Sequence, residues 1–199
     1  MMIFCSAQIP YQIYNNALEE YYENKLELAS ELLKKVNYNN DQNLEYRVKS
    51  LLYVIADEML DNFILIAENH SINYQIEYYK SIGNITPKIK GAINKRLSLL
   101  YLKRGDSLLN KGNYEEAYEY YKYAYTIETS NEEQIKIKFN NLIIAILNDA
   151  YKLLQNKDNL IAYEKLSFAK DISSENNNIN YFIDFIKIEI WSSGIAFKS

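Results

Sequence analysis

The fold is decided by the stretch Gly112-Asn113-Tyr114-Glu115-Glu116-Ala117. Its glycine predicts a turn. The two glutamates that follow belong in the first turn of a helix, where negative charge offsets the positive end of the helix dipole. Ala117 begins a small, aromatic, small series on one helical face, which Tyr121 and Ala124 continue. Small residues at this spacing predict a close crossing of two helices, because a larger side chain would push the helices apart.

The same pattern occurs at two other places in the chain. Asn24-Lys25-Leu26 precedes Ala29, and Lys157-Asp158-Asn159 precedes Ala162, at the spacing that joins the central turn to Ala117. The three alanines indicate pairs of helices that recur about every 44 residues. The intervening pair, 42–83, has the helical periodicity without the turn motif. A single helical bundle with one chance match is the alternative to a repeat.

Helical periodicity extends along the whole chain. Glycine and proline together number only seven of 199 residues, too few for the tight turns of a sheet protein. Asp41 and Ser71 are expected N-caps, Gly83-Asn84 an expected helix end, and Thr86-Pro87 an expected helix start. We expect nine helices, at about 10–22, 25–37, 42–68, 72–82, 87–110, 114–128, 132–155, 159–172 and 178–191.

The helix expected at 132–155 carries two apolar rows. One row contains Leu142, Ile146, Ala150 and Leu153, and the other contains Ile144, Leu147, Tyr151 and Leu154. A helix on the outside of a bundle needs only one apolar stripe. Two rows predict packing both on the helix's own partner and on the preceding pair, as in a solenoid.

The segment 98–131 resembles the tetratricopeptide repeat. The residues that carry the resemblance are Tyr101, Gly105, Gly112, Tyr114, Ala117, Tyr121 and Ala124, with Thr129 where that family usually has proline. The other copies are degenerate, since Asp149 stands beside Ala150 at a position that is usually apolar. The spacing of about 44 residues also exceeds the family's 34 or so. The resemblance implies an all-α, right-handed solenoid of antiparallel helix pairs, formed as one domain by residues 10–199.

The resemblance also implies a function. Such solenoids hold a peptide or partner protein in a concave groove lined by the first helices of the pairs. If 98–131 and 143–176 are neighbouring repeats, one groove surface is expected to contain Lys103, Asp106, Asn110, Asn148, Tyr151 and Gln155. Simple solvation of these side chains is the alternative, as are sites at Trp191 or at the tyrosine-rich N-terminal pair. The rival function is that of a structural subunit in an obligate protein assembly.

No catalytic apparatus is found in the sequence. His70 is the only histidine and Cys5 the only cysteine, so a His/Cys zinc set cannot be assembled. We expect His70 to be a solvated helix-end residue. The pairs Glu115-Glu116 and Glu132-Glu133 are expected to serve helix N-termini. The chain contains neither a Gly-x-Ser-x-Gly motif nor a glycine-rich phosphate loop. We therefore expect a non-enzymatic protein without cofactor or metal.

Composition limits the partners and the compartment. A net charge of −4, with no run of more than two basic residues, argues against nucleic-acid binding. No apolar run approaches the roughly 20 residues of a membrane span. A single cysteine fits a reducing compartment and slightly favours the cytoplasm. Alternatively, residues 1–7 of the N-terminal segment 1–9 are the remnant of a signal peptide. The 20 tyrosines indicate either a recognition surface or a codon bias.

Overall fold

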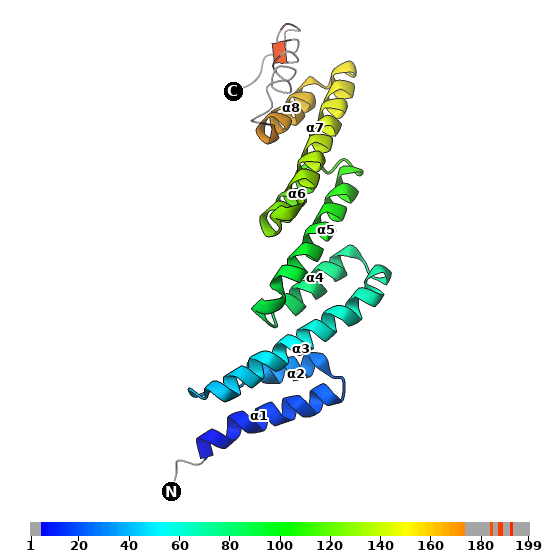
Figure 1. Ribbon diagram of the computed structural model, residues 1–199. Helices are drawn as coiled ribbons and strands as arrows, with labels where there is room; N and C mark the ends of the chain where they lie inside the picture. The colour runs from blue at the N-terminus through cyan, green and yellow to red at the C-terminus, as the bar shows by residue number, and fades with distance from the viewer. Residues whose placement is uncertain (1–4, 174–183, 185–186, 189–191, 193–199) are drawn as a thin grey trace. The chain divides into compact units, whose positions relative to one another are not determined.

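The computed structural model describes residues 5–173, 184, 187, 188 and 192 of the chain (Figure 1). Within these residues the chain forms eight α-helices and three short 3-10 turns, and it has no strand. The predicted all-α class is therefore confirmed. The ninth predicted helix, about 178–191, falls mostly on residues outside the described part. Contacts divide the chain into two compact units, Met1–Leu100 and Tyr101–Ser199.

The first unit contains four complete helices: α1 (Cys5–Tyr22), α2 (Leu26–Lys34), α3 (Gln42–Ile66) and α4 (Ile72–Gly83). The 3-10 turns Ala67–Asn69 and Pro87–Ile89 follow α3 and α4. Consecutive helices pack on one another, α1 on α2, α2 on α3, and α3 on α4. Their buried faces supply an aliphatic core that includes Leu33, Leu44, Val48, Ile55 and Ile82.

The predicted caps of this unit are confirmed. The Asp41 carboxylate accepts hydrogen bonds from the backbone N–H groups of Asn43 and Leu44, both at 3.0 Å. Ser71 Oγ accepts from the N–H of Tyr74 at 3.3 Å. Thr86 caps the 3-10 turn whose first residue is proline. Each bond satisfies a backbone donor that the first turn of a helix leaves without a partner.

Three predicted boundaries were wrong, one of them the start of the fifth helix, which begins at Lys90 after the 3-10 turn rather than at 87. The first helix begins at Cys5 rather than near residue 10, so Pro10 lies inside α1. Proline's fixed φ suits a helix, and its missing N–H costs that helix one hydrogen bond. The second helix ends at Lys34 rather than near 37. In the linker that follows, Asn39 and Asn40 have left-handed φ values of 46° and 67°, which a helix cannot continue through.

The second unit begins within α5 (Lys90–Leu109) and continues through α6 (Tyr114–Ile127), α7 (Glu132–Gln155) and α8 (Asn159–Ile172). The 3-10 turn Thr129–Asn131 joins α6 to α7. The predicted bounds of α7 and α8 are confirmed. Helix α7 packs on both α6 and α8. The core between them includes Leu108, Tyr121, Ile135, Leu142, Ile146 and Leu166.

Three turns of the chain share one geometry. The turns before α2, α6 and α8 each place one residue in the left-handed region: Asn24 (φ 60°), Gly112 (φ 78°) and Lys157 (φ 65°). The backbone N–H of the next residue donates to the carbonyl five residues back, as Asn113 does to Leu108 at 3.0 Å. The same bond joins Lys25 to Glu20 and Asp158 to Leu153, at 2.9 Å each. This is the Schellman arrangement, which closes the end of a helix.

The small residues after these turns are buried as predicted. Ala29, Ala117 and Ala162 are each fully buried. Across from Ala117, Gly105 lies beneath the ring of the fully buried Tyr121. A Cβ atom on Gly105 would stand 2.7 Å from Tyr121 Cδ1, and closer still to Cε1. Glycine is therefore required here by the close approach of α5 and α6.

Candidate functional site: the exposed face of α7

Five of the six predicted site residues lie on two helices. Lys103 and Asp106 share one face of α5, with Asn110 in the turn directly after its end, and Asn148, Tyr151 and Gln155 share one face of α7, because residues three and four apart are neighbours on a helix. Five of these side chains are exposed, and Asp106 is half-buried. The structure therefore places each row on a surface, but Asp106 differs from the rest.

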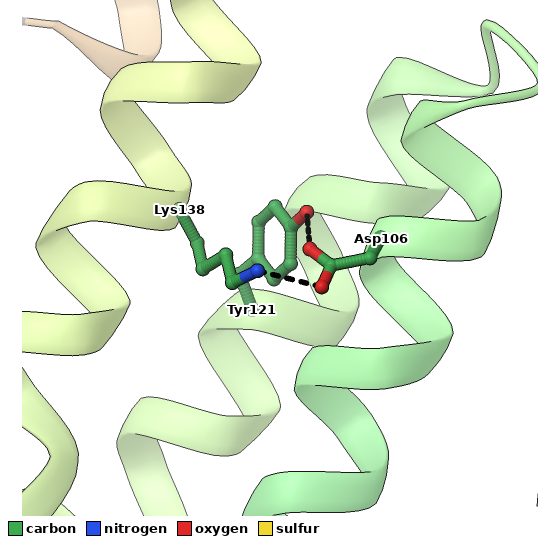
Figure 2. A network of polar contacts seen from close by, with 3 residues as sticks. All are labelled: Asp106, Tyr121 and Lys138. Atoms are coloured by element: carbon green, nitrogen blue, oxygen red, sulfur yellow. Dashed lines mark hydrogen bonds and ion pairs between the residues drawn. The ribbon is translucent and has the colours of Figure 1, made fainter.

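Asp106 is engaged by the protein itself (Figure 2). Tyr121 Oη on α6 donates a hydrogen bond of 2.8 Å to Asp106 Oδ1. Lys138 Nζ on α7 lies 2.6 Å from Asp106 Oδ2. Burial, and then the hydrogen bond to Asp106, raise the pKa of Tyr121 above its usual value. One carboxylate thus ties together α5, α6 and α7.

The contact between Asp106 and Lys138 shows which residues of α5 and α7 lie side by side, and they differ from the pairing expected from the sequence. Asp106 lies beside Lys138, whereas the prediction placed Asp106 beside Tyr151. Tyr151 is thirteen residues further along α7, or about 20 Å at 1.5 Å per residue. The structure therefore does not bring Asp106 and Tyr151 side by side. The physical reason is that α7 uses its first half to contact α5 and α6 and its second half to contact α8.

The second half of α7 is held by a similar network. Lys165 Nζ of α8 lies 2.9 Å from Asp149 Oδ2. The same ammonium group stands 4.6 Å from the centre of the Tyr114 ring, within range of a cation–π interaction. Burial, followed by Asp149, raises the pKa of Tyr114. The charge at Asp149, which departs from the tetratricopeptide pattern, is therefore paired between α7 and α8.

The outward face of α7 carries a line of six residues that we call the α7 seam: Ile137, Asn141, Ile144, Asn148, Tyr151 and Gln155. At about 100° per residue, all six fall within about 40° of one line along the helix. The line spans about 27 Å. The exposed fractions of Ile137, Ile144 and Tyr151 are 52%, 54% and 54%, and the three amide side chains are also exposed.

The exposure of the α7 seam corrects a further prediction. Ile144 and Tyr151 were expected to pack in a second apolar row, yet each is about half exposed. Leu147 and Leu154 of the same predicted row are partly buried against the core. The first predicted row therefore lies mainly in the core, whereas the second is divided between partly buried leucines and the exposed Ile144 and Tyr151.

The α7 seam has no charged residue, which is unusual for the outward face of a helix. Elsewhere in the chain exposed faces carry charges, such as Arg47, Lys49 and Asp57 on α3 or Glu119 and Lys122 on α6. The signal in the sequence is the segment 139–148, which contains no Asp, Glu, Lys or Arg. Sequence reasoning used this segment for its apolar rows and missed its lack of charge.

A shallow cavity of about 420 Å³ lies between the start of α6 and α8. Its walls include Tyr114, Glu116, Glu164 and Phe168. The cation at its edge, Lys165, is already paired with Asp149. The cavity thus combines carboxylates and aromatic rings around an ion pair of the protein itself.

The remaining features considered in the sequence are His70, a possible metal site and a possible membrane span. His70 is half-buried after a 3-10 turn, with its ring 4.6 Å from that of Tyr74 and 5.9 Å from that of Phe63. It therefore packs on aromatic rings, where the sequence predicted a solvated residue. Among the described residues, no group of three His, Cys, Asp or Glu side chains is placed to hold a metal ion. None of the described helices is both long and apolar enough to cross a membrane.

The fold and the site define the chain as an all-α protein of packed helix pairs with an uncharged helical face. Comparisons with protein-family models, with curated proteins and with solved structures found no match for this chain.

Proposed function

We propose that this chain is a non-enzymatic protein–protein interaction module, and that the α7 seam is part of its binding surface. The observation that carries the proposal is the uncharged, half-apolar seam on a helix whose opposite face lies in the core. Isoleucine and tyrosine side chains gain free energy when a partner removes them from water. Amide groups between them can donate and accept hydrogen bonds at the same time. Three of the six predicted site residues, Asn148, Tyr151 and Gln155, belong to this seam.

We further propose that the helix pairs are divergent copies of a tetratricopeptide-like repeat, arranged as a right-handed solenoid with a concave groove. Two observations support this. The turns at Asn24, Gly112 and Lys157 share their left-handed residue and their hydrogen bonds. Gly105 and Tyr121 make the close approach expected of the small and aromatic positions of that repeat. The proposed partner is a protein or peptide, with no role for nucleic acid.

The shifted titratable groups support a non-enzymatic role, because each has a structural partner. The pKa of Asp41 is lowered by the hydrogen bond from Tyr11 and by the two backbone N–H groups it caps. The pKa values of Lys25, Lys49 and Lys136 are raised by surface carboxylates. Catalytic groups differ from these in that their shifted pKa values serve a reacting molecule.

The alternative is a structural subunit of an obligate assembly. Exposed apolar side chains outside the α7 seam favour it, among them Leu65 and Ile66 at the end of α3 and Leu160 at the start of α8. An obligate subunit purified alone is expected to aggregate, whereas an interaction module is expected to stay dispersed. Light scattering of the purified chain separates the two.

The test of the proposed function is capture of a partner by wild-type and altered chains. Ile144→Glu places a charge in the centre of the α7 seam. Leu160→Glu is the matched control, since Leu160 is equally apolar, also exposed, and lies on α8. We expect Ile144→Glu to weaken binding of an identified partner at least tenfold, about 1.4 kcal/mol, while Leu160→Glu leaves binding unchanged. Equal binding by all three chains, each with an unchanged melting temperature, would contradict the proposal.

A further inference from the structure

The six residues of the α7 seam are separated by four, three, four, three and four positions. This alternation is the spacing of the contact line in a two-helix coiled coil, in which side chains of one helix insert between those of the other. Residues of one chemical type recur every seven positions. Ile137, Ile144 and Tyr151 form the apolar series, and Asn141, Asn148 and Gln155 form the amide series.

From this pattern we infer that the partner at the α7 seam is a second copy of this chain, which pairs its α7 with that of the first copy in parallel. The inference rests on the proposed function, because it names the occupant of the same surface. Pairing about a two-fold axis parallel to the helices brings each residue against the same residue of the second copy.

The chemistry of the seam is complementary to itself. An amide side chain carries both donors and an acceptor, so Asn141 and Asn148 can each hydrogen-bond to their own counterparts. Ile144 meets an identical isoleucine, and both leave water. A single amide at this position of a coiled coil specifies register and oligomer state at a cost in stability, and the α7 seam has amides at three such positions. The seam therefore specifies its own partner.

The same chemistry selects the parallel orientation. An antiparallel pair would place the amide series of one copy against the apolar series of the other. Asn141 and Asn148 would then be buried without hydrogen-bond partners, which is unfavourable. Parallel pairing avoids that loss at every level of the seam.

The charges of the chain are arranged consistently with self-pairing. Any charged residue on a two-fold seam would face its own like charge, and the α7 seam contains none. Beside the seam, Lys138 is neutralised by Asp106 within the same copy. Its flanks otherwise contain Asn140, Ala145, Leu147 and Leu154, together with the charged residues Glu133, Lys136 and Lys152, of which Lys136 is paired with Glu132 of the same copy. Each copy carries a net charge of −4, so an uncharged line is the surface that two copies can bring together with least repulsion.

The described residues of the C-terminal segment contact a different helix. Asp184 pairs with Lys170 of α8 at 3.3 Å, and Lys187 Nζ lies 5.2 Å from the centre of the Tyr163 ring, also on α8. These contacts place that part of the chain on α8. A single pair of helices about 27 Å long buries a small surface, so the dimer is expected to be weak and reversible.

Cross-linking tests the pairing and its direction. Cys5→Ser leaves the chain without cysteine, since Cys5 is the only one. Into this background Asn141→Cys and Gln155→Cys are introduced separately, with the exposed Lys122→Cys on α6 as the control. In a parallel pair, both seam variants form disulfide-linked dimers under mild oxidation and the control stays monomeric. In an antiparallel pair, neither seam variant links to itself, and Asn141→Cys instead links to a cysteine in the apolar series, as in a mixture with Tyr151→Cys. Equal cross-linking of the control, or an antiparallel result, overturns the inference.

Sedimentation velocity of the unaltered chain separates the two proposals. We expect its average mass to rise with concentration from the 23.4 kDa monomer toward a dimer. Ile144→Glu should raise the dissociation constant at least tenfold, and Leu160→Glu should not change it. A monomer at every concentration up to about 1 mM would overturn the self-pairing. If a different protein is still captured and is lost with Ile144→Glu, the proposed function stands while this inference fails.

Discussion

Replacing Gly105 with alanine tests the packing that the sequence pattern and the structure share. In an isolated helix this change is stabilising by about 1 kcal/mol, because glycine loses more conformational freedom on folding than alanine. In this chain the added Cβ would lie 2.7 Å from Tyr121 Cδ1 and closer to Cε1, where real Cβ atoms essentially never come within 3.0 Å. The ring has no free space, since Tyr121 is fully buried.

The size of the effect follows from three contributions. Overpacking of a full core costs about 1–3 kcal/mol. Displacing the ring also strains the hydrogen bond from Tyr121 to Asp106, and a bond to a charged group contributes about 1.5–3 kcal/mol. The higher helix propensity of alanine offsets about 1 kcal/mol of this loss in stability. We therefore expect Gly105→Ala to lower the free energy of unfolding by about 2–4 kcal/mol.

The matched control lies on the same helix. An added Cβ at Gly91 in α5 meets no atom within 4 Å. Gly91→Ala should therefore stabilise the chain by about 0.5–1 kcal/mol. Urea unfolding followed by circular dichroism measures both variants, with the midpoint as the readout. If Gly105→Ala unfolds at the same urea concentration as the wild type, or at a higher one, the close approach of α5 and α6 is refuted.

Three further predictions concern stability. Ala117→Leu should cost on the order of 1–3 kcal/mol by overpacking, and an unchanged melting temperature would contradict it. Asp106→Ala should lower the free energy of unfolding by about 1–3 kcal/mol, because Tyr121 loses its hydrogen-bond acceptor. Asp106→Asn keeps an acceptor and should lower it less. If both variants lose the same stability in urea unfolding, the hydrogen bond does not contribute. Tyr78 has a pKa of about 12 in the folded chain, raised first by burial and then by Glu27, against 10.0 when unfolded. The unfolded chain therefore releases its proton first, so stability should fall between about pH 10 and 12, less steeply for Tyr78→Phe in a pH series of melts.

The helices could be predicted from the sequence because their signals are local. Each cap and each turn involves residues within a few positions of one another, as at Asp41 and at Ser71. Apolar spacing also predicted the buried row of α7 with Leu142, Ile146 and Ala150, but it did not show that Ile144 and Tyr151 of the second row are exposed. Pro10 is the exception, because proline is best tolerated in the first turn of a helix and therefore predicted a start near residue 10, whereas α1 begins at Cys5.

How far one helix is shifted along its neighbour could not be predicted in the same way. The alignment of alanines placed Asp106 opposite Tyr151, but the ion pair with Lys138 sets a different level. A motif repeated every 45 residues fixes equivalent positions within two pairs. It does not determine which part of α7 packs on the preceding helices and which part packs on α8. That division depends on the length of α7, which exceeds what a repeat of about 34 residues would need.

The role of the tyrosines could not be predicted from the sequence, because their hydroxyl groups bond to residues that are distant along the chain. In the described part of the chain, several of their hydroxyl groups donate to carboxylates far away in the sequence, among them Tyr11 to Asp41, Tyr21 to Glu58, Tyr78 to Glu27 and Tyr121 to Asp106. The separations are 30, 37, 51 and 15 residues, so no local pattern announces these bonds. A recognition surface and a codon bias were the alternatives, and neither describes a hydroxyl that bridges two parts of the fold.

A physical reason for these bonds lies in the charge balance. The chain has 26 acidic residues and 22 basic ones, and several of the basic residues pair with carboxylates on their own helix, as Lys49 does with Glu45. Some carboxylates that face another helix still pair with a lysine, as Asp149 does with Lys165, but others need a donor that carries no charge. A tyrosine hydroxyl meets that need at the end of a rigid ring, with less loss of side-chain freedom than a lysine would suffer. The ring fills the space between the helices while the hydroxyl satisfies the carboxylate. In a chain of long helices with few turns, tyrosine thus supplies both the packing and the polar contacts that position one helix on the next.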